Sequence, residues 1–456
     1  MDFRRKLIRL ALPISFQTLM LAMVAACDAF MLGRLDQDAM AAVSLATQVQ
    51  FVQNMLLSCI AGTLSILGAQ YWGRGDADSI GRLFRISLRT VLGVSVVFAS
   101  ACIFFPDVLM RLFARSDSPL VGIGARYLRI AGVSYLFTGV SQCYLASMKV
   151  TDHVNRATAI SIGTVLVNIV LNAIFIFGLC GVPRMGVEGA AIATVVARVL
   201  EFGAAAASSH QRGYVRAGWR RLFERYPLLS KDFRKCALPL LGGAFFWGIG
   251  FSSYTAAMGH IGDDAAAANA VAAVIRDLLC CLCDGTAYGG GIVVGNELGA
   301  GNLARGKRYG GKLAKISVVT GFVAMAMVLL SILPVTRFLP IDLTDEAREL
   351  LGQMMVVLSI YMVGRCVNTI VINGIFAAGG DTLFDFYSLA VCMWGLAVPL
   401  AFLGVFVFHW HPVLVYACTC VDEVGKLPWV AAHYRRYLWV KDLTRPSEAR
   451  ASEACA

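Results

Sequence analysis

The chain has 456 residues, of which 58% are hydrophobic and only 15% charged, and its mean hydropathy is +0.69. Apolar runs of about 20 residues recur along it, which excludes an ordinary water-soluble domain and predicts a protein that spans a bilayer. The formal net charge of +11 lies mainly in short loops between the apolar runs. No basic stripe interleaves with aromatic residues, so a nucleic-acid partner is excluded.

Charged or Gly/Pro-rich breaks divide the apolar runs into about twelve spans. A span in lipid must satisfy its own backbone hydrogen bonds, so these spans are helices rather than strands. The fold class that follows is an all-α integral membrane protein of about twelve transmembrane helices. The expected spans cover residues 8–32, 45–71, 84–105, 121–147, 158–179, 187–208, 237–261, 267–294, 313–335, 348–377, 385–408 and 413–433.

The second half of the chain repeats the first at a shift of 226 positions, from residue 13 to residue 239. The first matched segment is an Ala-Leu-Pro triplet at residues 11–13 and 237–239. Further identical pairs in this register are Gly33 and Gly259, Gly73 and Gly299, Gly75 and Gly301, and Arg82 and Arg308. Membrane-length repeats predict two homologous six-helix lobes and are typical of transporters whose substrate path lies between the halves.

The repeat predicts four segments. These are an N-terminal six-helix lobe at 1–209, a cytoplasmic connector at 210–235, a C-terminal six-helix lobe at 236–440 and a cytoplasmic tail at 441–456. The connector is the only long polar stretch between spans, and we expect an amphipathic helix at the membrane surface there. Lys and Arg concentrate in alternate loops, so we expect a multi-pass protein of the bacterial inner membrane with both termini in the cytoplasm.

Motifs for enzymatic chemistry fail on physical grounds. The segment from Gly301 to Arg308 has the spacing of a P-loop, but Arg308 stands where a Ser or Thr hydroxyl must bind magnesium. His409 and His411 have no carboxylate or thiolate beside them, which favours an interfacial belt over a metal site. We therefore expect no enzyme, no catalytic residue, no metal site and no cofactor.

Polar residues inside the spans point to function, because a charge at the centre of a membrane helix costs about 2.5–3.5 kcal/mol on insertion scales. Asp28 in the first span has no basic residue at i±3 or i±4. Asn168 and Asn172 lie one helical turn apart, as do Ala190 and Thr194 in the next span. Together they predict a polar pocket in the first half, although the Asn pair is equally consistent with a structural role in hydrogen bonding between helices.

Other unusual residues have local explanations. Arg198 with Glu201, and Glu423 with Lys426, are spaced i,i+3, so each pair can neutralise itself and favours a structural role. Gly285, Gly289, Gly291, Gly295 and Gly299 form small-xxx-small pairs. These glycines predict close helix contact or a deformable helix.

Several segments, taken in their order and spacing, resemble the multidrug and toxic compound extrusion (MATE) family of cation-coupled efflux transporters. The resemblance covers roughly residues 7–440. Its carriers are residues 12–14 (LPI), Asp28 and 31–33 (MLG), 41–44 (AAVS), 168–172 (NIVLN), 186–194 (GVEGAAIAT), 294–299 (VGNELG) and 379–382 (GGDT).

The resemblance implies a V-shaped bundle of two lobes that alternates between outward- and inward-open states. Such a protein exports amphipathic organic cations or related drugs against the entry of sodium or protons. Carried over by position, the cation-coupling site is formed by Asp28, Asn168, Asn172 and Thr194, with the Ala190 carbonyl as an extra ligand.

This chain departs from the family pattern inside that site. Many relatives have an aspartate at the position of Asn172, so Asp28 is here the only acid in the pocket. Sodium prefers several hard oxygens with net negative charge, whereas a single desolvated acid can serve a proton by taking it up. The coupling ion is therefore a proton or sodium, with the proton favoured.

A second departure lies in the C-terminal lobe. The run 245–248 (FFWG) resembles a branch of the family in which a glutamate precedes the first Phe, but here that place is Ala244. We therefore expect coupling to rest on the N-terminal lobe. The substrate cavity is expected to be lined by residues that repack around dissimilar ligands, namely Met20, Met23, Phe245, Phe246 and Trp247.

The expected partners are a small-molecule substrate and membrane lipid, for a protein that acts as a monomer. A lipid-linked precursor flippase of the same superfamily remains an alternative, but it calls for a cationic cavity that binds pyrophosphate, and no cluster of cavity arginines is evident. A membrane receptor or enzyme is the alternative from a different class. It would need a sensor domain or a catalytic constellation.

Overall fold

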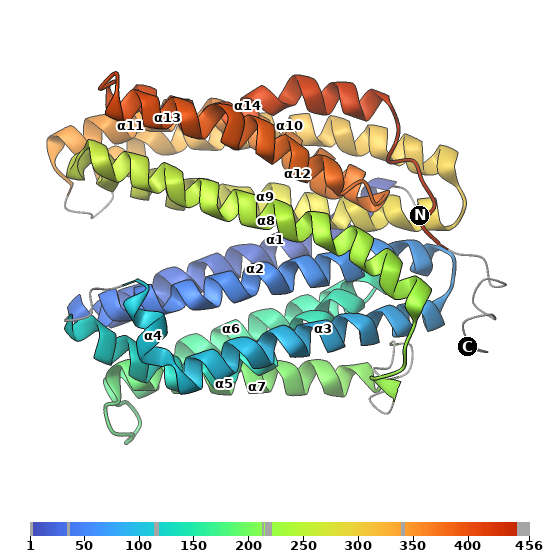
Figure 1. The fold of residues 1–456 in the computed structure, drawn as a ribbon, viewed down its shortest axis with the longest axis horizontal. Helices are drawn as coiled ribbons and strands as arrows, with labels where there is room; N and C mark the ends of the chain where they lie inside the picture. Colours follow the sequence, from blue (N-terminus) through green and yellow to red (C-terminus); the bar gives the residue numbers. More distant parts are fainter. Residues whose placement is uncertain are drawn as a thin grey trace. The chain divides into compact units, whose positions relative to one another are not determined.

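The computed structural model describes residues 3–33, 37–113, 118–211, 214, 221–338 and 343–444. Within these ranges the side chains of residues 24–30, 32, 33 and 37 are outside the description. Regular structure in the described ranges is helical and includes no strand. The expected all-α fold is confirmed (Figure 1).

The helices follow one another with short connections (Figure 1). In chain order they are α1 (Phe3–Gly33), α2 (Gln37–Gly73), α3 (Ala77–Phe104), α4 (Pro106–Arg111), α5 (Pro119–Val150), α6 (Val154–Phe177), α7 (Gly186–Ser209), α8 (Pro227–Ile261), α9 (Asp263–Gly299), α10 (Leu303–Phe338), α11 (Asp345–Asn368), η2 (Thr369–Phe376), α12 (Leu383–Leu389), η3 (Ala390–Ala397), α13 (Val398–Phe406) and α14 (Pro412–Arg435).

Eleven helical stretches of the described chain are long and apolar enough to cross a bilayer. The helix α14 has 24 residues, which is long enough to cross a bilayer. It is not among the eleven because it carries the charged residues Asp422, Glu423 and Lys426 at its centre. With α14 the described part of the chain has the twelve long helices that the sequence predicts. Large apolar side chains such as Val319 and Leu330 of α10 are 62% and 78% exposed, as expected of a surface that faces lipid.

The internal repeat is visible in the bounds of the helices. At the shift of 226 positions, α2 (Gln37–Gly73) falls on α9 (Asp263–Gly299), and both have 37 residues. In the same way α7 (Gly186–Ser209) falls on α14 (Pro412–Arg435), and both have 24 residues. The two halves of the chain therefore build the same series of helices.

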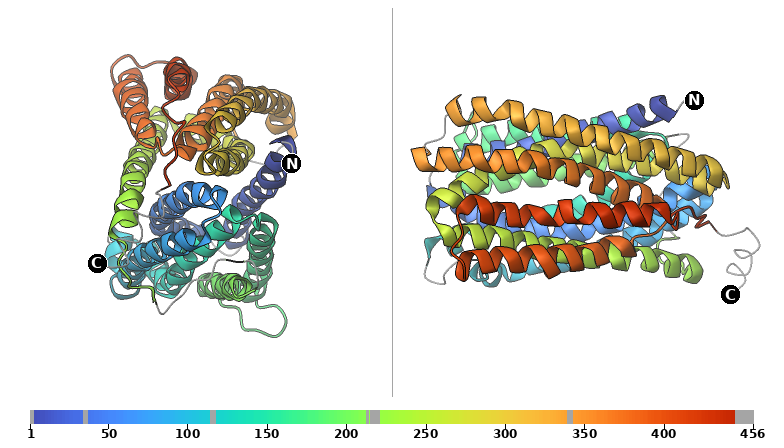
Figure 2. Two further views of the ribbon diagram at one scale, coloured as in Figure 1. Left: turned by 90° about the vertical axis from the view of Figure 1, so that its right-hand side faces the viewer. Right: turned by 90° about the horizontal axis from the view of Figure 1, so that it is seen from above.

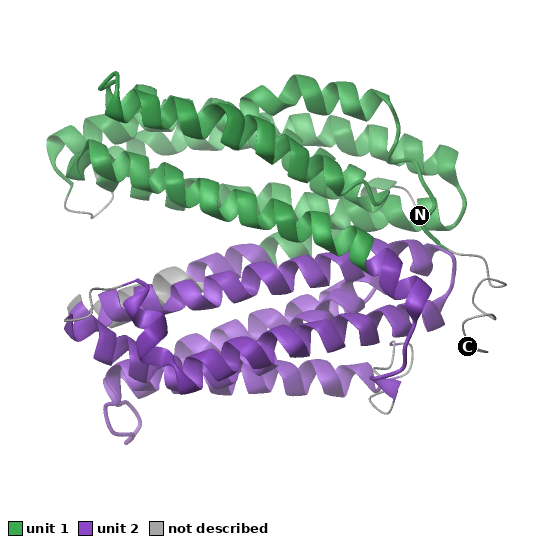
Figure 3. Cartoon of the chain, viewed as in Figure 1, with its two compact units in different colours: residues 1–16, 234–444 green, residues 17–233, 445–456 purple. Residues whose placement is uncertain are grey.

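The chain divides into two compact units (Figure 3). Unit 1 comprises residues 1–16 and 234–444, and unit 2 contains residues 17–233. The sequence-based division placed the whole first helix in the N-terminal lobe, whereas residues 3–16 of this helix group with the C-terminal helices. Within each unit the long helices lie side by side (Figures 1 and 2).

The glycines of α9 explain how the start of α1 packs in unit 1. A Cβ added at Gly289 would lie 2.8 Å from the backbone nitrogen of Ala11, and one added at Gly285 would lie 2.5 Å from that of Ser15. Only glycine leaves room for another backbone at these distances. The close helix contact predicted for this glycine series is observed.

The expected connector at 210–235 differs from the structure in its second half. Residues 227–235 form the first turns of α8, because Pro227 is suited to the first turn of a helix. Residues 212, 213 and 215–220 of the connector lie outside the described residues, as does the tail from 445. The amphipathic surface helix therefore stays a prediction.

Unit 1 contains two stretches of π-helix, η2 and η3, each of eight residues. The corresponding stretches of unit 2, residues 143–150 at the end of α5 and residues 164–171 within α6, are ordinary α-helix. The π-helix is rare and is frequently found at functional sites. They direct attention to the interior of unit 1.

Candidate functional site

The polar pocket predicted in the first half falls in unit 2. Asn168 and Asn172 are 8% and 1% exposed, on the helix α6, which is long and apolar enough to cross a bilayer. The Asn172 Nδ2 donates to the Asn168 Oδ1 over 3.5 Å. The side chain of Asp28 lies outside the described residues.

Ala190 and Thr194 lie on α7, which packs against α6. The Thr194 hydroxyl donates to the Ala190 carbonyl over 3.0 Å, so this carbonyl already has one hydrogen bond. Ala190 belongs to a core cluster that also includes Met31, three residues after Asp28. The structure thus brings the end of α1 and the helix α7 into one core. Each polar pair described here is hydrogen-bonded within its own helix.

The Arg198 and Glu201 pair of α7 confirms the expected i,i+3 contact. The Arg198 Nη1 lies 2.7 Å from the Glu201 Oε2, and the carboxylate side chain is only 4% exposed. The pair therefore neutralises itself, as predicted.

The five residues expected to line the substrate cavity have different surroundings. Met20 in unit 2 is partly buried, and Met23 is 46% exposed. In unit 1, Phe245 is 45% exposed, whereas Phe246 packs edge-on against Phe386 and Trp394. Trp247 lines a cavity within unit 1. Their role in substrate binding stays a prediction.

The cavity in unit 1 has a volume of about 250 Å³. It is lined by α8, α11, η2, α12 and α14. Its walls combine apolar, amide and charged side chains. The lining residues are Leu240, Gly243, Ala244, Trp247, Arg365, Asn368, Thr369, Ile372, Asn373, Asp385, Leu389, Glu423 and Lys426.

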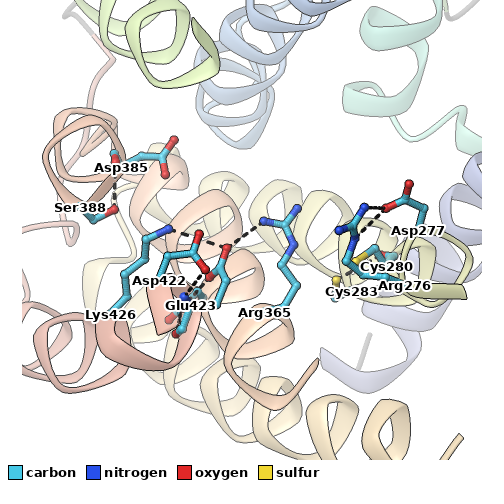
Figure 4. A network of polar contacts seen from close by, with 11 residues as sticks. Arg276, Asp277, Cys280, Cys283, Arg365, Asp385, Ser388, Asp422, Glu423 and Lys426 are labelled. Atoms are coloured by element: carbon cyan, nitrogen blue, oxygen red, sulfur yellow. Dashed lines mark hydrogen bonds and ion pairs between the residues drawn. The ribbon is translucent and has the colours of Figure 1, made fainter. Parts of the chain in front are cut away.

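Glu423 of α14 organises the charged part of this wall (Figure 4). Its Oε1 lies 3.1 Å from the Arg365 Nη1 and 3.7 Å from the Lys426 Nζ. The Asn368 Nδ2 donates to its Oε2 over 2.8 Å. Glu423 and Lys426 are 4% and 3% exposed and Arg365 is 21% exposed. The pair that the sequence presented as self-neutralising is part of a larger buried network.

Two further carboxylates flank the network. Asp422 is 3% exposed, and it accepts a hydrogen bond of 2.7 Å from the backbone amide of Glu423. Asp385 of α12 lies on the other side of Lys426 from Arg365 (Figure 4). A Cβ added at Gly243 of α8 would lie 3.0 Å from the Asp385 Oδ2, so this carboxylate faces α8. No group of three or more His, Cys, Asp or Glu side chains in the described chain is arranged to hold a metal.

Sequence reasoning missed this cluster, although one signal was present. Arg365 lies inside the expected span 348–377 and has no acid at i±3 or i±4. This is the same criterion that singled out Asp28. Its partner Glu423 lies 58 residues further on, and no local spacing connects the two.

Comparisons with known proteins agree with the repeat and the fold. The profile of the family described as MatE matches residues 13–174 and again 240–403. The "Uncharacterized transporter YisQ" of Bacillus subtilis is 23% identical over 405 residues, which cover 87% of this chain and 86% of that protein. The "Probable multidrug resistance protein NorM" of Bradyrhizobium diazoefficiens is 26% identical over 420 residues, covering 88% of this chain and 86% of that protein.

Solved structures show the same fold. A transporter of the MOP superfamily from Pyrococcus furiosus superposes with a TM-score of 0.87 at 18% identity, covering 96% of both chains. The MATE transporter VcmN of Vibrio cholerae in its bent form gives a TM-score of 0.84 at 16% identity, covering 96% of this chain and 97% of that one. At these identities the likeness is one of fold.

Proposed function

The chain belongs to the MatE family, and on this premise we propose that it is a secondary active antiporter that exports amphipathic organic cations or drugs in exchange for protons or sodium. As a member of this family it is a multi-pass membrane transporter and not an enzyme. The observation that carries the proposal is the match of the family profile to both halves of the repeat. A relative named as a multidrug resistance protein supports drug export.

The proposed setting is the bacterial inner membrane, with both termini in the cytoplasm and one chain as the working unit. The excess of Lys and Arg in alternate loops supports this orientation. Alternating access by two homologous lobes requires one driving ion. Each charge that crosses the membrane gains ~2.3 kcal/mol per 100 mV, so ~150 mV supplies about 3.5 kcal/mol, enough for a gradient of several hundred-fold of an uncharged substrate.

We assign ion coupling to the pocket of unit 2 around Asp28, Asn168, Asn172 and Thr194, with the Ala190 carbonyl beside Thr194. Support comes from the burial of two amides in an apolar helix, which is costly unless they serve a partner or a ligand. Amide and hydroxyl groups reorient to hydrogen-bond either protonation state of a neighbouring carboxyl group. This property favours a proton over sodium as the coupling ion.

The wall of the cavity in unit 1 argues against the flippase alternative. Its two cations, Arg365 and Lys426, are both held by Glu423. They are therefore not available as a cationic clamp for a pyrophosphate group, which needs unpaired donors.

The test of the proposal is Asp28→Asn in proteoliposomes loaded with a fluorescent cationic dye. We expect efflux driven by a proton gradient to fall at least tenfold, because the amide cannot exchange a proton, while folding and membrane insertion are kept. Asp38→Asn, which removes an exposed carboxylate at the start of α2, is the control. A mutant that pumps dye uphill at the normal rate would show that Asp28 is not the coupling acid. Efflux that requires sodium and persists without a pH gradient would replace the proton by sodium.

A further inference from the structure

The charges around the cavity of unit 1 do not balance. Arg365 and Lys426 contribute two positive charges, and Glu423 and Asp422 contribute two negative ones within the same buried network. Asp385 is the fifth charged group and adds one negative charge. Since buried charges are stable only when they are paired, the cavity lacks one positive charge.

Neighbouring charges do not supply this missing positive charge. Arg276 of α9 is already paired with Asp277 over 2.9 Å. Asp284 of α9 is close enough to Arg365 for their charges to interact, and it adds negative rather than positive charge. The surroundings of the cavity therefore increase the demand for a cation.

The negative charge that lacks a cationic partner is the carboxylate of Asp385. Lys426 is near enough to interact with the Asp385 carboxylate electrostatically, but it forms its ion pair with Glu423. Within the part of the chain that the structure describes, no ion pair or hydrogen bond reaches the carboxylate of Asp385. The carboxylate lies at the cavity wall beside Gly243, where a bound molecule can contact it.

The size and the walls of the cavity indicate an organic ligand. A volume of about 250 Å³ exceeds what a proton or a sodium ion needs and is near the lower end of ligand pockets, roughly 300–1,000 Å³. Apolar side chains line it beside the charged groups, among them Leu240, Trp247 and Ile372. The Trp247 ring stacks on Phe251 with centroids 5.4 Å apart, which holds an aromatic face in place. Aromatic faces attract cations.

An anion is a poor ligand for this cavity. It would have to displace Glu423 from Arg365 and Lys426, which contact the same Oε1 atom, and it would deepen the negative excess. The π-helical stretch η2 contributes Thr369, Ile372 and Asn373 to the wall. It therefore adds neutral polar groups and no positive charge.

We propose that the cavity of unit 1 binds an organic monocation of small size, with Asp385 as counter-ion of its positive centre and Trp247 as the face against which its apolar body packs. This inference deepens the proposed function, on which it rests for the identification of the bound cation as a transported compound. It gives the two units different tasks. Unit 1 binds the organic cation and unit 2 binds the coupling ion.

The test measures binding directly, to the purified full-length protein in detergent and without any ion gradient. The probe is benzyltrimethylammonium, whose charge is permanent and which has no proton to donate. Benzyl alcohol and benzoate serve as neutral and anionic probes. We expect calorimetry to show that the cation binds and that both other probes bind at least tenfold more weakly.

Substitutions then locate the site. We expect Asp385→Asn to weaken binding of the cation at least tenfold, and Trp247→Leu to weaken it more than Trp247→Phe does. Asn373→Asp in the Asp385→Asn protein returns a carboxylate to the cavity wall and should recover part of the affinity. Asp277→Asn is the control, because this carboxylate is 65% exposed and pairs with Arg276 without lining the cavity. The affinity of the Asp277→Asn protein for the cation should stay within twofold of that of the unmodified protein.

An Asp385→Asn protein that binds the cation as well as the unmodified protein does overturns the inference. If that protein also loses gradient-driven efflux, Asp385 handles the coupling ion instead. If binding depends on Asp385 while the unmodified protein moves no cation uphill in proteoliposomes, the antiport proposal fails and the binding site stands.

Discussion

At two pairs of equivalent positions, unit 1 has a charged residue and unit 2 has a small uncharged one. At the shift of 226 positions, Arg365 of α11 corresponds to Gly139 of α5, and Glu423 of α14 corresponds to Ala197 of α7. A Cβ added at Gly139 would lie 2.5 Å from the Ser95 Oγ, and Ala197 is 2% exposed. One series of helices thus forms a tightly packed interior in unit 2 and a charged cavity in unit 1.

The difference shows how a repeated scaffold acquires two kinds of site. In the pocket of unit 2, the side chains of Asn168, Asn172 and Thr194 are amides and a hydroxyl, and these need no compensating charge. In unit 1, Arg365 stands where unit 2 has a glycine, and Glu423 of the packed helix α14 supplies the opposite charge. Ala244 of α8 lines the same cavity as Asp385 of α12, so the carboxylate at this wall comes from α12 and not from α8.

Removing the carboxylate that holds the network should have the largest effect on stability. In Glu423→Gln, Arg365 and Lys426 lose the negative charge that both contact. Breaking a buried ion pair costs about 3–5 kcal/mol, because the remaining charge is left uncompensated. We expect a large fall in the midpoint of thermal unfolding in detergent, and partial recovery in the double variant with Arg365→Gln.

The matched control is Glu201→Gln in unit 2. Its partner Arg198 is 25% exposed and can turn toward lipid headgroups or water, so the loss should be clearly smaller. Equal losses in the two units would show that the network of unit 1 is no more tightly coupled than a single pair.

Replacing Gly139 by alanine tests how tightly the interior of unit 2 is packed. The added methyl group in Gly139→Ala meets Val91, Ser95 and Leu57, and overpacking of this kind costs about 1–3 kcal/mol. Gly163→Ala on α6 is the control, since nothing lies within 4 Å of its Cβ, and alanine favours a helix over glycine. Unfolding in detergent should distinguish the two. A Gly139→Ala protein as stable as the control would mean that unit 2 is less densely packed than the structure indicates.

The sequence predicted the twelve helices well because membrane spans carry a strong and local signal. Even α14, whose charges lower its hydropathy, was expected at 413–433 and is found at Pro412–Arg435. The cavity was not predictable in the same way, because Arg365, Asp385 and Glu423 come from three helices. Whether Arg365 has a partner depends on packing between helices, and spacing along the chain does not contain this information. The π-helical form of residues 369–376 likewise gave no sign in the sequence.

The smallest predicted difference concerns the caps of two equivalent helices. Ser118 caps α5 and accepts a hydrogen bond of 3.3 Å from the Leu120 amide. Thr344 caps α11, accepts one of 3.1 Å from the Ala347 amide and also donates one of 2.5 Å to Asp264 of α9. Loss of a cap costs about 0.5–2 kcal/mol, so Thr344→Ala should lie near the upper end and Ser118→Ala near the lower end.

Thermal unfolding in detergent measures this difference, with Thr344→Ser as the control, since its hydroxyl can make both bonds. The asymmetry arises because the hydroxyl of Thr344 joins two helices of unit 1, whereas among the described residues that of Ser118 bonds only within its own helix. If the two alanine variants lose the same stability, the bond to Asp264 adds nothing, as expected of a contact that water replaces without loss. A larger loss for Thr344→Ala places the additional stabilisation in the contact between α9 and α11.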